Sequence, residues 1–179
     1  MLFRSLPVFS LYGKDSKRLT PAMLDNDLAY NEDLLANWQA FCAAPGCAFC
    51  DWPGYHYRQH ADSASRRGLP PQSLDDQRRA AALIRGSVPG QWPVLQQSAN
   101  AFYYEKLVYL ASMILRRANA ADYRVPLNEL KIGIAAGADD PQLGRNPLLP
   151  RSIRLSAWLT LHMPRLWQWA CRNFLKDRQ

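Results

Sequence analysis

The sequence has little of what most known classes of enzyme depend on. It contains only three histidines, His56, His60 and His162. It lacks the short motifs of phosphate-binding loops, dinucleotide folds, zinc proteases and serine hydrolases. A cysteine nucleophile, Cys50 or Cys171, that meets a histidine in space is a further hypothesis, which no spacing supports. We therefore expect a protein without catalytic activity.

Long hydrophobic runs are also missing. No stretch approaches the roughly 18 uninterrupted apolar residues of a membrane-spanning helix. Pro7, Ser10 and Gly13 interrupt the first apolar residues, and no small-residue cleavage site follows, so a signal peptide is not expected. Residues 1–19 are instead predicted to form an N-terminal arm, extended or as a short strand. The predicted location is the cytoplasm, where the four cysteines would be reduced thiols or metal ligands.

Lysine is scarce although the chain is basic. The net charge is +7, and 17 of the 22 basic side chains are arginine. Arginine presents a planar fork that suits phosphate or carboxylate, so an acidic partner such as nucleic acid, an anionic membrane or an acidic protein is indicated. Genomic base composition would explain the arginine content equally well. With 48% apolar and 21% charged residues, residues 1–179 are predicted to be one globular domain.

Apolar residues recur at helical spacing through most of the chain. This spacing predicts helices over residues 21–43, 55–67, 74–85, 94–119 and 128–136. A terminal helix over 151–177 is either kinked or divided in two at Pro164. Residues 94–119 are expected to be the central helix, and glycine and proline are expected to break any long element between 125 and 150. The predicted fold is all-α, a bundle of five or six helices.

Five potential metal ligands lie close together in the sequence: Cys42, Cys47, Cys50, His56 and His60. Cys47 and Cys50 have the C-x2-C spacing that supplies two zinc ligands from one turn, and a histidine with Cys42 would complete a structural zinc site. The three cysteines also have the spacing of a plant-type iron–sulfur centre, with Cys171 as the fourth ligand, but the β-rich pattern of that fold is missing. Free thiols in a packed loop are the third interpretation.

Most of the positive charge lies at the end of the chain. Residues 141–179 hold seven basic side chains and one acidic, which makes a basic C-terminal helical segment. At about 100° per residue, Arg165, Arg172 and Lys176 fall within roughly a 40° arc, with Trp169 at its edge. The other side of this helix is predicted to pack inward through Leu166, Trp167, Ala170, Cys171 and Phe174. His162, in an apolar run, is expected to be a core histidine.

Aligned cations beside an aromatic ring are typical of a surface that contacts phosphate backbone. The leading hypothesis is a non-catalytic, nucleic-acid-associated protein, a small basic subunit of a larger nucleoprotein assembly. The residues predicted to contact nucleic acid are Arg151, Arg154, Arg165, Trp169, Arg172 and Lys176.

Other interpretations of the same helix stay open. An anionic membrane surface would suit it, and so would simple exposure to solvent. The alternative function is an adaptor or chaperone-like subunit of a secretion, conjugation or defence machine. Such a subunit would bind a protein partner through Trp92, Trp158 and Trp167.

Overall fold

The computed structural model describes residues 28–44, 70–117 and 120–174, which form seven α-helices, one 3-10 helix and no strand. The prediction of an all-α protein is confirmed, with seven helices in the described ranges rather than five or six. The chain divides into two compact units, residues 1–70 and 71–179. That residues 1–179 form a single domain stays a prediction. The predicted arm and the predicted helix over 55–67 lie outside the described residues.

The first unit contains helix α1, Glu32–Ala43. The predicted helix over 21–43 is confirmed at its end but is wrong over 28–31, which are not helical. Asn31 has a φ of 63°, in the left-handed region that asparagine tolerates better than most residues, so the chain turns sharply just before α1. Residues 21–27 lie outside the described residues. Within this unit Leu28 and Leu35 are buried.

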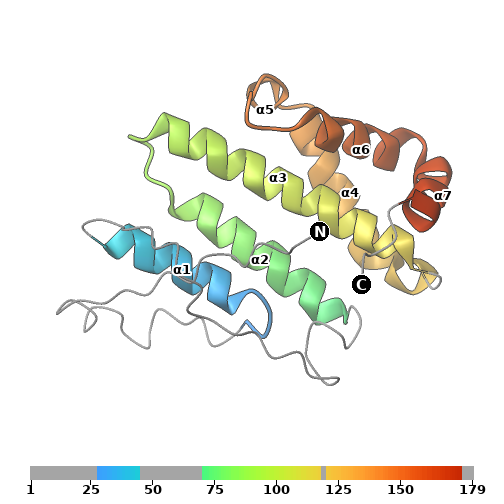
Figure 1. Cartoon of the computed structure of the whole chain (residues 1–179), viewed down its shortest axis with the longest axis horizontal. Helices are drawn as coiled ribbons and strands as arrows, with labels where there is room; N and C mark the ends of the chain where they lie inside the picture. The colour runs from blue at the N-terminus through green and yellow to red at the C-terminus, as the bar shows by residue number, and fades with distance from the viewer. Residues whose placement is uncertain (1–27, 45–69, 118–119, 175–179) are drawn as a thin grey trace. The chain divides into compact units, whose positions relative to one another are not determined.

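The second unit is built around one long helix. Helix α2 spans Pro71–Ser87 and α3 spans Pro93–Arg116, each beginning with a proline, which needs no helical N–H partner at that position. Helix α3 contacts α2, α4, α6 and α7, as Figure 1 shows, so the prediction of a central helix is confirmed. Its fully buried side chains include Leu107, Leu110 and Ile114.

A short 3-10 helix, η4 (Ala120–Tyr123), precedes helix α4, Arg124–Ala138. The sequence predicts a shorter helix here, because Pro126 and two glycines lie in the segment. Pro126 falls in the first turn, where a missing N–H costs nothing. A Cβ added at Gly133 would lie 2.9 Å from Leu107, and one at Gly137 would lie 2.4 Å from the Tyr104 ring. The glycines therefore permit close approach to α3 and do not break the helix.

Three further helices complete the second unit: α5 (Pro141–Gly144), α6 (Arg151–His162) and α7 (Pro164–Phe174). The predicted terminal helix is thus two helices, of which the second begins at Pro164. The Asp140 carboxylate caps α5 by accepting a hydrogen bond from the Gln142 N–H at 2.8 Å. Asn146 is buried and donates to the Gln97 carbonyl of α3 at 2.7 Å. This bond fixes the segment before α6 to the central helix.

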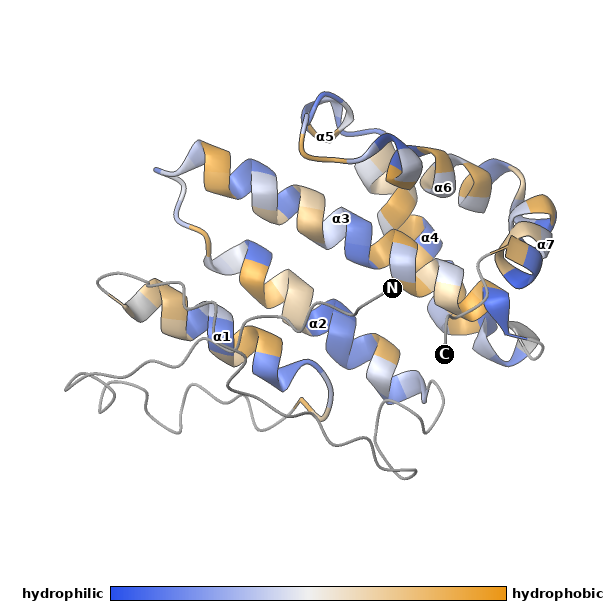
Figure 2. Cartoon of the chain, in the orientation of Figure 1, coloured by the Kyte–Doolittle hydropathy of each residue, from blue (hydrophilic) through white to orange (hydrophobic). Residues whose placement is uncertain are grey.

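Hydropathy differs between two of the helices that pack against α3. Figure 2 shows mostly hydrophobic residues on α4 and a mixture of hydrophobic and hydrophilic residues on α7. Within the described ranges, no helix combines the length and the apolar content that crossing a bilayer would require. Helix α7 thus combines charged and apolar side chains.

Candidate functional site

Helix α7 packs against α3 and α6 with one side only. Cys171 is fully buried and Trp167 is half-buried on the packed side. On the other side Arg165, Trp169 and Arg172 are exposed, in agreement with their predicted orientation. These three side chains are spaced four and three residues apart, so they form one line along the helix. Lys176, the fourth predicted member, lies outside the described residues.

The packed side of α7 is narrower than the sequence predicts. Leu166 is 47% exposed and Phe174 is 73% exposed, so the prediction that both pack inward is wrong. Leu166 follows Arg165 and points about 100° away from the half-buried Trp167. Phe174 ends the helix, and its ring meets Trp169 edge-on with 5.3 Å between ring centroids. The outward surface therefore carries apolar as well as cationic groups.

Arg172 joins α7 to the end of the central helix. Its Nη2 donates a hydrogen bond of 2.6 Å to the carbonyl of Arg117, the C-cap residue of α3. The carbonyl end of a helix carries a partial negative charge, so a guanidinium there is favourable. The bond links residues 55 positions apart in the sequence and brings the Arg116–Arg117 pair close to the last turn of α7. Sequence spacing could not predict this contact.

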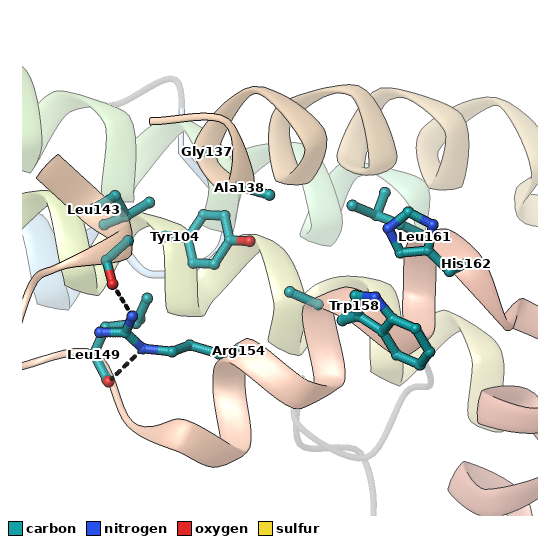
Figure 3. Close-up of a pocket in the computed structure, with 11 residues that line it drawn as sticks. Tyr104, Gly137, Ala138, Leu143, Leu149, Arg154, Trp158, Leu161 and His162 are labelled. Carbon is teal, nitrogen blue, oxygen red and sulfur yellow. Dashed lines mark hydrogen bonds between the residues drawn. The ribbon is translucent and has the colours of Figure 1, made fainter. Parts of the chain in front are cut away.

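The two predicted contact residues at the start of α6 differ in their surroundings. Arg151, the first residue of α6, is exposed. Arg154 is half-buried and donates to three backbone carbonyls, which belong to Gly144, Asn146 and Leu149. Two of these bonds are visible in Figure 3. The guanidinium of Arg154 thus holds the α5–α6 connection. Arg151 is exposed to solvent, as a residue that contacts nucleic acid has to be.

The outer face of α6 is more apolar than that of α7. Leu155 is 58% exposed and Trp158 is 49% exposed, one turn apart on the helix. His162 follows on the same face and is exposed, so the prediction of a core histidine is wrong. Its ring lies against Trp158 with 5.4 Å between centroids. The α6 helix ends there, which leaves its last turn at the surface.

The three tryptophans predicted as protein anchors are not equally accessible. Trp92, the N-cap residue of α3, is 55% exposed, and Trp158 is also accessible. Trp167 lines a cavity of about 490 Å³, where its buried Nε1 has no hydrogen-bond acceptor among the described residues. Lys106 lines the same cavity, and burial lowers its pKa. Trp167 therefore belongs to the packing of α7 rather than to its outer surface.

Most of the predicted metal ligands, namely Cys47, Cys50, His56 and His60, lie outside the described residues. Cys42 is exposed on α1, and the described residues contain no cluster of three or more metal-binding side chains. The zinc and iron–sulfur hypotheses stay predictions. Cys171 is buried, and burial raises the pKa of its thiol. A neutral, inaccessible thiol is a poor nucleophile, which argues against Cys171 in that role.

No protein-family model, curated protein or solved structure matches this chain. Function is therefore inferred from the chemistry of the surface. The exposed line Arg165–Trp169–Arg172 combines an accessible indole with two guanidinium groups, of which that of Arg172 already donates a hydrogen bond to the Arg117 carbonyl. This line, here called the α7 cationic line, can contact anionic groups and stack on planar ones.

Proposed function

We propose that this protein binds nucleic acid without sequence preference, through the α7 cationic line, as a non-catalytic subunit of a nucleoprotein assembly. The observation that carries the proposal is the exposure of Arg165, Trp169 and Arg172 on one line of a helix whose opposite side is packed. The two arginines are seven residues apart, about 10 Å along the axis. Groups this far apart would contact different phosphates of one bound strand.

Charge in the surrounding segment supports an anionic partner. Residues 141–174 contain five arginines, no lysine and no aspartate or glutamate. A surface of one sign concentrates counter-ions and accelerates the approach of a polyanion. Displacement of those counter-ions on binding makes affinity fall with salt. Arg145 and Arg151 are exposed within this segment and add positive charge outside the α7 cationic line.

The Trp169 indole explains why no sequence preference is expected. The side chain is 55% exposed and lies between the two arginines of the line. Every base has a π face that can stack on an indole, and such stacking is worth about 1–3 kcal/mol per base. Guanidinium contacts with phosphate carry no sequence information. Together they favour a single strand, in which bases are free to stack.

A second candidate function is binding of a protein partner as an adaptor. It is favoured by the exposed apolar side chains between residues 155 and 174, which are Leu155, Trp158, Met163, Leu166, Trp169 and Phe174. Tryptophan, phenylalanine, methionine and arginine are enriched at protein interfaces. A contact of this type would depend much less on ionic strength than a contact with phosphates.

Fluorescence anisotropy with a labelled oligothymidylate tests the proposal on the full chain. Wild-type protein should bind at low salt, and Trp169→Ala should weaken binding about tenfold through lost stacking. Arg165→Ala should weaken it as well. The matched control is Arg124→Ala, which removes another exposed arginine, from α4. Absence of oligonucleotide binding by the wild type, or equal weakening by Arg124→Ala and Arg165→Ala, would overturn the proposal and leave the adaptor function.

A further inference from the structure

The second unit contains a cavity of about 230 Å³ away from the α7 cationic line. Residues of α3, α4, α5 and α6 line it, and Figure 3 shows their side chains. Its apolar wall includes Leu143, Leu149 and Leu161. An engineered cavity of about 150 Å³ with apolar walls binds benzene. The cavity in this protein is therefore large enough for a substituted benzene ring.

One polar group in this cavity has no hydrogen-bond partner among the described residues. Tyr104 of α3 is 5% exposed, and its hydroxyl makes no hydrogen bond to any described residue. In Figure 3 the hydroxyl points toward the space framed by Ala138, Leu161 and Trp158. Burial raises the pKa of Tyr104, so the hydroxyl keeps its proton and can donate. The hydroxyl oxygen is accessible from the cavity, so the acceptor atom of a ligand could take this hydrogen bond in place of water.

The one charged side chain that lines the cavity is a cation. Arg154 lines it, and no aspartate or glutamate does. The Arg154 guanidinium is held in place by its three carbonyl contacts and acts electrostatically on the Tyr104 hydroxyl. An anionic acceptor placed near that hydroxyl would be stabilised by Arg154, whereas a cation would be repelled. The apolar wall favours a ring as the remainder of the ligand.

We propose that this cavity binds a small aromatic carboxylate, with the ring against the leucine side chains and a carboxylate oxygen accepting the Tyr104 hydroxyl hydrogen bond. The site is independent of the proposed nucleic-acid surface. The ring packs between α3, α4 and α6, and the Arg154 guanidinium offsets the cost of removing the carboxylate from water. Trp158 lies at the edge of the cavity, where its fluorescence would report an occupied site.

Titration of the full chain with benzoate, followed by isothermal calorimetry and by ligand-observed NMR, tests this site. Wild-type protein should bind benzoate saturably, and benzylammonium, which has the same ring and the opposite charge, should not bind. Tyr104→Phe removes only the hydroxyl and should weaken benzoate binding about tenfold or more. Its matched control is Tyr103→Phe, because Tyr103 lies under Arg85 and does not line the cavity.

A second pair of variants tests the location without touching Tyr104. Ala138→Trp places bulk at an exposed position that lines the cavity and should abolish benzoate binding. Ala136→Trp makes the same change at an exposed position of α4 that does not line it and should bind like the wild type. The proposal is overturned if benzoate does not bind, if benzylammonium binds equally well, or if Tyr104→Phe and Ala138→Trp bind benzoate as tightly as their controls.

Discussion

At the scale of single residues, glycine has two different roles in the helices of this protein. Gly86 and Gly137 are each the penultimate residue of a helix, α2 and α4. A Cβ at Gly86 would meet nothing within 4 Å, whereas a Cβ at Gly137 would lie 2.4 Å from the Tyr104 ring. Only Gly137 is therefore required by packing.

These two glycines give a matched pair of stability variants. Gly137→Ala should lower the free energy of unfolding by about 1–2 kcal/mol, because the added methyl displaces the Tyr104 ring. Gly86→Ala should raise it by up to about 1 kcal/mol through helix propensity. Urea unfolding followed by circular dichroism measures both. Equal effects of the same sign would show that Gly137 is not in close contact with Tyr104.

Cys171 gives a prediction about alkaline pH. Burial raises the pKa of its thiol above the ordinary value of 9.0, so the folded protein holds a proton that the unfolded chain has lost. The stability contributed by the neutral thiol is complete below that value and is lost as pH rises through the folded pKa. The free energy of unfolding should therefore fall more steeply above about pH 9 for wild type than for Cys171→Ala.

Urea unfolding at a series of pH values provides this measurement. Other groups with raised pKa values, such as Tyr104, contribute equally to both proteins, so the difference in slope isolates Cys171. Parallel pH profiles for wild type and Cys171→Ala would contradict the raised pKa. As a second check, alkylation of the native protein should label the exposed Cys42 and leave Cys171 unlabelled until denaturant is added.

The residue-scale predictions from sequence were right where helical geometry alone decides the answer. The line Arg165–Trp169–Arg172 follows from 100° per residue. The predictions for Leu166, Phe174 and His162 were wrong, because burial depends on which neighbouring helices reach each side. Helix α7 contacts α3 and α6 over a narrow arc, and helical periodicity does not give the width of that arc.

At the scale of elements, Arg154 fixes the connection between α5 and α6. Its three carbonyl bonds should make it a stability residue: Arg154→Ala should lower the free energy of unfolding by about 2–4 kcal/mol. Arg151→Ala removes the same charge from the exposed start of α6 and should change stability by less than about 0.5 kcal/mol. Thermal and urea unfolding compare the two. Similar small losses would mean that the carbonyl contacts do not hold this connection.

Helix positions followed from the sequence where apolar periodicity is continuous, as over α3 and the two terminal helices. Periodicity failed where glycine lies against another helix, since α4 runs through both Gly133 and Gly137. From sequence alone, glycine is expected to break a helix. The close approach of the Leu107 and Tyr104 side chains explains why glycine occupies these two positions. The start of α1 was misplaced because Asn31 turns the chain into a left-handed conformation.

At the scale of the whole molecule, charge is distributed unevenly along the chain. The segment 141–174 has five arginines and no acidic residue, whereas residues 1–50 are net negative by one. The sequence revealed this asymmetry and the identity of the α7 cationic line. It did not reveal that Arg117, from the end of α3, lies beside Arg172, because a contact across 55 residues leaves no local pattern. The Tyr104 cavity was hidden for the same reason.

The salt dependence of oligothymidylate binding tests the central claim most directly. Each phosphate contact with a single strand contributes about 0.7 to the slope of log affinity against log salt concentration. If α7 binds phosphates, Arg165→Ala should have a slope shallower than wild type by about 0.7, while the exposed-arginine control Arg124→Ala should keep the wild-type slope. Identical slopes for wild type, Arg165→Ala and Arg124→Ala would contradict a phosphate contact at this helix.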